Sequence, residues 1–476
     1  MGRLLLLLIF VQALTWGKAQ SPSRFFSKIG GEGEDIGYSG KITLDDNYII
    51  AGLSSSYGTH GNTDAYIVKL NSFGTISWTK FIGGIGNDAA KSVIQLADSG
   101  FVFTGYTTSL GAGGYDMYLV RMDKQGNVLW ERTFGGTEWD FGQDVVLAYN
   151  NKLYVVGKTL SMGKGGYDGF VVEYDLNGNK GNHYFFGSAG EDDLRSIINT
   201  QDSCLMAVGQ NALRDTDGDI FAVKFKYNGH TVFNKYIGGP YLDFVNVVAQ
   251  TNGLDDYYTL VGKKTYSLDV PGFSYYVRMN KNGVVQKDTN FQRNKSEEEA
   301  SSVCNSYARR YFVAMARTPN FKGGKGRQEE VIVLWPDAHE QFINDSGLES
   351  DEAVFSIEPT KDGGYFSVGY TSSFSSTGRD IYYIKRDTLN LPYQNEVGLE
   401  EKVNGYYFFI ANKQITFPTK DVSHLTLWSI DGKQICDLDE NDLSASVSLG
   451  NLESGVYILS LSSRSGERIT KKLLIE

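Results

Sequence analysis

The chain has 476 residues and a formal net charge of −11. A chain of this length is too long to fold around one small core, so we expect at least two domains. Its acidity excludes a nucleic-acid partner, which would require a concentrated basic surface. The 55 glycines, 30 tyrosines and 27 phenylalanines, against 8 prolines, favour strands joined by tight turns.

The N-terminus has the pattern of a secretory signal peptide, which we place at residues 1–19. Arg3 gives the positive start, and the apolar stretch Leu4–Leu14 is too short to span a bilayer comfortably. Gly17 and Ala19 are small residues where a signal peptidase selects its site. A membrane anchor is the alternative. No later segment is apolar over 18 residues, so we expect no transmembrane segment in the mature chain.

A unit of about 52 residues recurs seven times between Phe25 and Tyr393. Each unit contains a pair of small residues that closes a β-rich run. The pairs are Ala51-Gly52, Thr104-Gly105, Val156-Gly157, Val208-Gly209, Val261-Gly262, Met315-Ala316 and Val368-Gly369. Internal repeats of this length, each rich in short strands, are typical of a β-propeller.

The second repeat shows the unit most clearly. Strands are predicted at residues 88–96, 101–107, 116–122 and 128–134, and four such strands make one blade. The seventh repeat lacks a clear fourth strand, whereas Phe25–Ile29 matches the fourth strands of other repeats. We therefore predict an all-β fold in which residues 20–394 form a seven-bladed propeller closed by the N-terminal strand.

The repetition stops before Asn395, and residues 395–476 contain alternating strands that suggest a small, immunoglobulin-like β-sandwich. Leu427–Lys433, then Gly455–Leu459, then the ending Lys471–Ile475 resemble the C-terminal sorting domain of type IX secretion substrates. The resemblance implies the type IX machinery as a partner. It also implies export through the periplasm, to a secreted or outer-membrane-attached state.

The repeats also resemble the Gly-rich propeller repeats of secreted bacterial proteins, through Asp362–Tyr365 and Val368–Ser373. That resemblance implies a fold and not a function, because propellers host many unrelated activities.

Aspartates recur at two positions of the repeat. A catalytic residue is needed in only one repeat, whereas a residue that fixes a turn is needed in every repeat, so we interpret these aspartates as turn-fixing residues. Those opening the first strand are Asp35, Asp88, Asp140, Asp192, Asp243 and Asp351. Those opening the third strand are Asp64, Asp116, Asp168, Asp219 and Asp380.

The long loops between the second and third strands should share one face with the connections between blades, and scaffold-held loops often carry binding sites. This face is rich in aromatic residues that could stack on sugars or anchor a protein. The candidate ligand-binding residues are Tyr57, Tyr115, Trp139, Tyr167, Tyr241, Tyr266 and Phe273. The alternative is that these rings pack against neighbouring loops.

Signals for cofactors are weak. Asp215, Asp217 and Asp219 could hold Ca²⁺, although a solvated turn explains them as well, and we expect no other cofactor. Cys204, Cys304 and Cys436 have no metal-ligand spacing and form no disulfide framework, so we expect them to be buried as small apolar residues.

The sequence contains no convincing catalytic signature, and its five histidines are scattered. The leading hypothesis is therefore a non-enzymatic, secreted or cell-surface propeller that binds a glycan or a protein. The alternatives are a polysaccharide hydrolase with carboxylates at the central channel and a structural surface component.

Overall fold

The computed structural model describes most of the repeat region and parts of the C-terminal region. The described residues are 25–57, 62–212, 218–239, 241–250, 257–267, 272–291, 298–305, 312–319, 327–334, 340–345, 351–373, 378–386, 409–411, 414–416, 422–429, 432–439, 446–448, 455–463 and 468–475. The predicted signal peptide and the boundary at residues 394 and 395 lie outside them.

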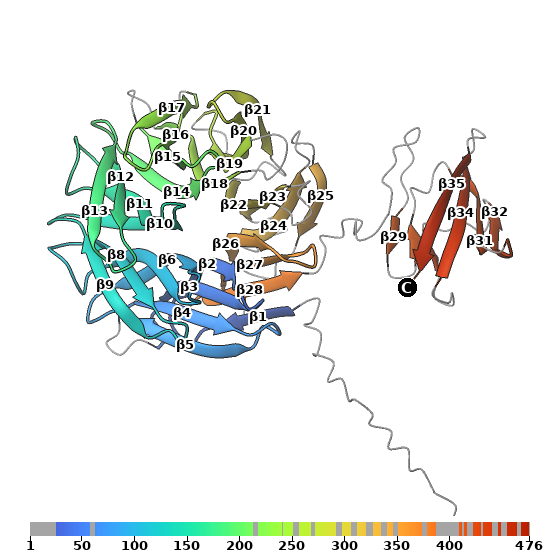
Figure 1. The fold of residues 1–476 in the computed structure, drawn as a ribbon, viewed down its shortest axis with the longest axis horizontal. Helices are drawn as coiled ribbons and strands as arrows, with labels where there is room; N and C mark the ends of the chain where they lie inside the picture. Colours follow the sequence, from blue (N-terminus) through green and yellow to red (C-terminus); the bar gives the residue numbers. More distant parts are fainter. Residues whose placement is uncertain are drawn as a thin grey trace, which may run out of the picture.

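From residue 25 to residue 386, the described residues form seven four-stranded antiparallel sheets set around a common centre (Figure 1). The first three sheets are β2 (Asp35–Ile42), β3 (Tyr48–Ser54), β4 (Asp64–Leu70) and β5 (Ile76–Ile82); β6 (Asp88–Gln95), β7 (Phe101–Thr107), β8 (Asp116–Met122) and β9 (Val128–Phe134); and β10 (Asp140–Leu147), β11 (Leu153–Thr159), β12 (Asp168–Tyr174) and β13 (Lys180–Phe186). The next three are β14 (Asp193–Asn199), β15 (Leu205–Asn211), β16 (Asp219–Phe225) and β17 (Thr231–Ile237); β18 (Phe244–Gln250), β19 (Tyr257–Lys264), β20 (Phe273–Asn280) and β21 (Val285–Phe291); and β22 (Glu299–Asn305), β23 (Phe312–Pro319), β24 (Arg327–Leu334) and β25 (Glu340–Asp345). The four strands predicted for the second repeat are confirmed.

The last sheet joins the two ends of the repeat region. It contains β26 (Glu352–Pro359), β27 (Tyr365–Thr371) and β28 (Asp380–Arg386), and its fourth strand is β1 (Phe25–Ile29). β1 runs antiparallel to β28, with Phe25 opposite Lys385 and Ile29 opposite Ile381. The N-terminal strand therefore completes the sheet of the last repeat, as predicted.

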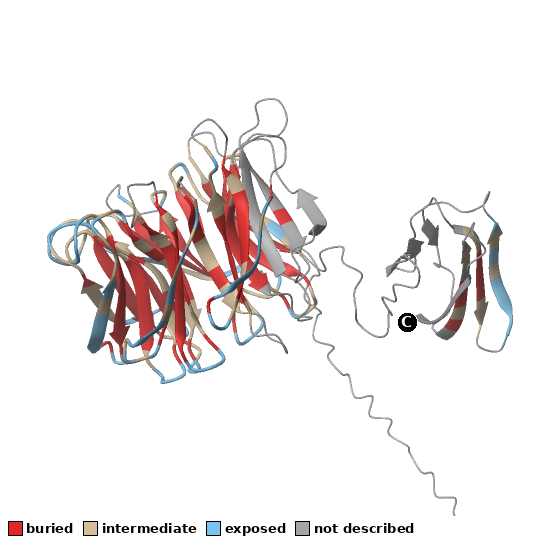
Figure 2. Cartoon of the chain, turned by 90° about the horizontal axis from the view of Figure 1, so that it is seen from above, coloured by how far each residue is buried: buried red, intermediate tan, exposed pale blue. Residues whose placement is uncertain are grey.

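The first strands of the sheets line the centre of this β-propeller fold. Each of β2, β6, β10, β14, β18, β22 and β26 contacts the first strand of the next sheet, and β26 contacts β2. The core lies between adjacent sheets, where buried residues follow the inner strands (Figure 2). Between the sheets that begin with β2 and β6, for example, Ile49, Ile67, Phe103 and Tyr118 form one cluster.

Every first strand of the seven sheets carries a β-bulge at the same point of the repeat. In β6 the bulged residue is Lys91, which lies between Ala90 and Ser92, and Ala90 pairs with Gly105 of β7. A Cβ on Gly105 would clash with the Ala89 carbonyl oxygen. The recurring small residue that defines the repeat therefore lets the bulged strand approach its neighbour.

The recurring aspartates fix turns, as predicted. Asp88 Oδ2 accepts hydrogen bonds from Gly84 N at 2.9 Å and from Ser109 Oγ at 2.6 Å. At the start of a third strand, Asp116 Oδ2 accepts one from Ala112 N at 2.9 Å. These bonds satisfy backbone amides where no strand partner is available.

Asp192 and Asp243 lie one residue before β14 and β18, yet they accept the turn amides of Ser188 and Gly239 as expected. The assignment of Asp351 is wrong by one residue. Glu352, and not Asp351, opens β26 and is fully buried. Its carboxylate accepts a hydrogen bond from Thr371 Oγ1 at 2.9 Å, so the longer side chain takes over the aspartate role in this sheet.

The described residues of the C-terminal region form two antiparallel sheets. One contains β29 (Phe409–Ala411), β30 (Gln414–Thr416) and β33 (Ser446–Ser448). The other contains β31 (Val422–Ser429), β32 (Gln434–Asp439), β34 (Gly455–Ser463) and β35 (Arg468–Ile475). The sequence predicts five strands in this region, at residues 406–411, 425–430, 446–449, 455–462 and 468–475. They correspond to β29, β31, β33, β34 and β35, whereas β30 and β32 were not predicted.

Two further observations concern the described residues as a whole. None of them belongs to a helix long and apolar enough to cross a membrane. The three cysteines are unbridged, and Cys204 and Cys304 are buried as predicted, whereas Cys436 is partly exposed.

Candidate functional site

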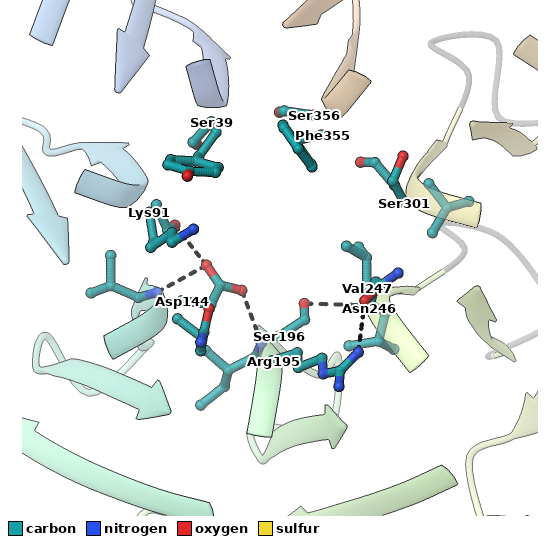
Figure 3. A pocket seen from close by; sticks show the side chains of 18 of the residues that line it. Ser39, Lys91, Asp144, Arg195, Ser196, Asn246, Val247, Ser301, Phe355 and Ser356 are labelled. Carbon is teal, nitrogen blue, oxygen red and sulfur yellow. Dashed lines mark hydrogen bonds between the residues drawn. The ribbon is translucent and has the colours of Figure 1, made fainter. Parts of the chain in front are cut away.

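The centre of the sheets holds a cavity of about 570 Å³, lined by residues of the first strands of all seven sheets (Figure 3). Its size is typical of a site for a small molecule or a short oligomer. The cavity is therefore the first place to look for a ligand.

Seven bulged residues, one from each first strand, line this cavity. We call them the bulge ring. Its members are Tyr38, Lys91, Gln143, Arg195, Asn246, Ser301 and Phe355. Their side chains differ in almost every blade, so the ring is asymmetric although the scaffold is repetitive.

In most blades, the side chain of the residue after the bulge forms a hydrogen bond with the first strand of a neighbouring sheet. Ser39 Oγ accepts from Val93 N at 3.4 Å, and Ser196 Oγ accepts from Val248 N at 3.4 Å. Asp144 occupies this position in β10 and accepts from Ile197 N at 2.9 Å. This position therefore serves the scaffold. Part of the bulge ring does so as well, because Asn246 Nδ2 donates to Ala300 O at 3.0 Å and Ser301 Oγ donates to Val354 O at 2.5 Å.

Two lysines of the cavity have lowered pKa values. The Lys91 ammonium lies 3.3 Å from the centroid of the Tyr38 ring, and burial, reinforced by the charge of Lys158, lowers the Lys91 pKa to about 7. The Lys158 ammonium, from β11, lies 4.2 Å from the Tyr167 ring centroid, and burial lowers its pKa too. The carboxylate of Asp193 opposes that shift.

The cavity also holds four carboxylates, and each is engaged. Asp144 accepts from Ser92 Oγ at 2.7 Å, and its burial raises its pKa. The other three carboxylates belong to Asp193, Glu299 and Glu358, which contact Arg195, Asn246 and Lys41 respectively.

The predicted long-loop face exists. Asp88 N donates to Thr63 O at 2.7 Å, and Thr108 N donates to Asn87 O at 2.9 Å. These bonds join the connection between two blades to the loops that follow the second strands, so both emerge on one face.

Three of the predicted aromatic residues gather around Phe141 of β10. Tyr115 lies 5.1 Å from Phe141 and 5.6 Å from Trp139, measured between ring centroids, and Tyr167 lies 6.4 Å from Phe141. We call these four residues the Trp139 cluster. Trp139 is 50% exposed, whereas Tyr115 and Tyr167 are half-buried.

The other predicted aromatics lie apart from this cluster. Tyr57 packs against Phe81 and donates a hydrogen bond to Gly30 O at 2.6 Å. Tyr266 packs against Phe273, with 5.3 Å between ring centroids, and Tyr241 is half-buried. Contacts between neighbouring rings thus account for many of the aromatic residues on this face. This is the alternative to ligand binding that the sequence analysis left open.

The proposed Ca²⁺ ligands Asp215 and Asp217 lie outside the described residues. Asp219 opens β16, and a Cβ on Gly238 would collide with its carboxylate, so it takes the turn position of its repeat. Within the described ranges, no group of three or more His, Cys, Asp or Glu side chains could hold a metal ion.

The sequence analysis missed the bulge ring. A signal was present, because Lys91 and Arg195 are long charged residues at equivalent points of strands that are otherwise small or apolar. Aligning the repeats and asking where they differ would have found the ring.

Comparison with known proteins identifies the C-terminal region. Residues 407–476 match the family model described as a secretion system C-terminal sorting domain. The chain therefore ends in a type IX sorting domain. The sorting domain confirms the resemblance seen in the sequence and indicates secretion to the cell surface or the extracellular space.

Solved structures similar to the repeat region share little sequence with it. One similar solved structure is BamB from Moraxella catarrhalis, at 12% identity and a TM-score of 0.40, covering 75% of this chain and 85% of that chain. Another is the Neurospora crassa Pan2 WD40 domain, at 11% identity and a TM-score of 0.44, covering 76% of this chain and 96% of that chain. No curated protein sequence matches the chain.

Lys91→Met is expected to stabilise the protein at pH 6 by on the order of 2 kcal/mol. The folded-state pKa of about 7 lies below the ordinary lysine value of 10.5. Below pH 7 Lys91 is charged in both states, and its charge lowers the free energy of unfolding. That penalty declines as the pH rises from 7 to about 10.5, because the folded protein then releases its proton first. Urea denaturation of both proteins at pH 6 and pH 10 measures the difference.

Lys124→Met, at an exposed turn, is the control and should change stability little at either pH. A Lys91→Met effect of equal size at pH 6 and pH 10 would mean that the gain comes from packing and not from the charge.

Proposed function

We propose that this chain is an exported, non-enzymatic, seven-bladed β-propeller that binds a glycan in its central channel, with the sorting domain folded as a small immunoglobulin-like sandwich. The seven four-stranded sheets and the contact of β26 with β2 support the closed ring. The two C-terminal sheets are consistent with a sandwich.

The bulge ring carries the functional proposal. A scaffold position tends to keep one chemistry through most of the repeats, as the position after the bulge does with Ser39, Ser92, Ser196, Ser302 and Ser356. The bulged position instead offers aromatic, cationic, amide and hydroxyl groups around one cavity. Such a mixture suits a sugar, whose apolar face stacks on aromatic rings and whose hydroxyls bond to amides and hydroxyls.

The engagement of the channel carboxylates supports binding over hydrolysis. A glycosidase needs one carboxyl group as a proton donor and another as a nucleophile or base beside the scissile bond. Asp144 accepts bonds from Ser92 and Ile197, and Glu358 pairs with Lys41. These contacts hold both groups in structural roles.

The long-loop face continues into the cavity. Lys158 lines the cavity and lies beneath the rings of Tyr167 and Phe141, at 4.2 Å and 5.5 Å from their centroids. The half-exposed Trp139 belongs to the same cluster. We propose that a glycan enters past this cluster and that its end occupies the channel.

A glycan array probed with residues 20–476 tests the proposal. We expect binding that Phe355→Ala and Trp139→Ala each reduce, because the first removes a ring from the channel and the second a ring from its mouth. Leu129→Ala is the control, since Leu129 is exposed on the outer strand β9. Failure of the folded wild-type protein to bind any glycan would refute the proposal and favour a protein ligand.

A further inference from the structure

We propose that the channel selects a carboxylated sugar, with Lys91 and Lys158 together receiving the carboxylate. This inference rests on the proposed glycan-binding function and names the ligand class. Lys91 belongs to the bulge ring, and Lys158 reaches the same cavity from β11.

The cations of the cavity fall into two kinds. Lys41 pairs with Glu358, and Arg195 Nε lies 2.9 Å from Asp193 Oδ2. Within the described residues, no carboxylate oxygen lies within 4.0 Å of the ammonium of Lys91 or Lys158. These two ammonium groups contact aromatic rings instead, so they are the cations that remain available to a ligand.

The same pattern separates these two partly exposed lysines from the buried cations of the sheets. Lys69 is bound by Asp45 at 3.1 Å, and Lys224 by Asp202 at 2.6 Å, and both of these lysines are almost fully buried. A buried cation normally needs a carboxylate partner. The lowered pKa values of Lys91 and Lys158 agree with a site that lacks its anion.

The charge of the whole cavity favours a ligand with isolated single charges. Four cations line it, and four carboxylates balance them. They are Lys41, Lys91, Lys158 and Arg195 on one side, and Asp144, Asp193, Glu299 and Glu358 on the other. A densely charged polyanion would meet those carboxylates, whereas one carboxylate can sit between two lysines. Arg195, which gives the two-pronged contact that phosphate prefers, is already occupied by Asp193.

The remaining wall suits the neutral part of a sugar. Tyr38 and Phe355 lie with ring centroids 5.4 Å apart and form an aromatic surface beside the lysine. Figure 3 shows Lys91, Asn246, Ser301 and Phe355 around the same opening. The rings can stack on a sugar face. Asn246 Nδ2 already donates to Glu299 and to Ala300 O, and Ser301 Oγ donates to Val354 O, so these two side chains would meet sugar hydroxyls as acceptors, through their oxygen atoms.

Calorimetry with residues 20–476 tests the inference. The probes are trimers of galacturonate and mannuronate and the acidic trisaccharide sialyllactose, each paired with its neutral counterpart: trimers of galactose and mannose, and lactose. We expect at least one acidic probe to bind at least about tenfold more tightly than its neutral partner. Lys91→Met and Lys158→Met should each remove about tenfold of that affinity, and Lys124→Met should remove none.

Two outcomes would overturn the inference. One is that no acidic probe binds the folded protein more tightly than its neutral partner. The other is that Lys91→Met and Lys158→Met bind the acidic probe as the wild type does while keeping their fold by circular dichroism. If neutral glycans bind and Phe355→Ala abolishes that binding, the proposed function stands and only the carboxylate preference fails.

Discussion

A truncated chain that begins at Gly30 is expected to lose at least about 4 kcal/mol of stability relative to one that begins at Phe25. The truncation removes β1, so β28 loses the antiparallel partner that spans Ile381 to Lys385. It also removes Phe25, whose ring lies 5.3 Å from the Tyr48 ring and 6.1 Å from the Tyr383 ring. Urea denaturation followed by tryptophan fluorescence measures the loss.

The exposed edge of β28 adds a second expectation. An unpaired strand edge recruits other chains, so the truncated protein should associate in a concentration-dependent way during size-exclusion chromatography. The chain that begins at Phe25 is the matched control. Its β28 edge is paired with β1, so it should not associate through that edge. An unchanged denaturation midpoint in the truncated protein would show that β1 adds nothing to the stability of the ring.

Gly105→Val is expected to destabilise the protein by about 3 kcal/mol. Gly105 pairs with Ala90 beside the bulge, and any Cβ would collide with the Ala89 carbonyl oxygen. Relief requires the backbone of β6 to move away, which would disturb Lys91 and the hydrogen bond from Ser92 to Asp144. Thermal and urea denaturation measure the loss.

Gly105→Ala provides a graded comparison. The sixth repeat has Ala316 at the equivalent position, where β22 and β23 still pair around a bulge, so one methyl group can be accommodated. The alanine variant should therefore lie between the wild type and Gly105→Val. Equal stability of all three proteins would contradict the steric role of the small residue.

The fold could be predicted because its signals are periodic. The small-residue pair, the turn aspartates and the match of Phe25–Ile29 to other fourth strands each follow from backbone requirements that recur in every blade. Asp351 was misplaced because the last repeat replaces the aspartate with Glu352, and the sequence offers an acidic residue at both positions.

The candidate site could not be predicted in the same way. A bulge adds one residue to a strand, and the strand continues on both sides of it. Beyond the bulge, the alternation of buried and exposed residues is shifted by one position, so the sequence pattern does not show which residue is the added one. Lys158 reaches the cavity from a second strand, and its proximity to Lys91 depends on how neighbouring blades pack. The exposure of Trp139 and the partial burial of Tyr115 depend on the same packing.

The closing strand also sets an order of events for the folding chain. Phe25 is synthesised long before its partner Lys385, which lies 360 positions later. A contact of such long range is entropically costly to form before the intervening sheets exist. The other sheets can each form from consecutive strands, so the joining of β1 to β28 should be the last and slowest step. Until then the unpaired edge of β28 and the free β1 segment remain open to chaperones, proteases or a second chain.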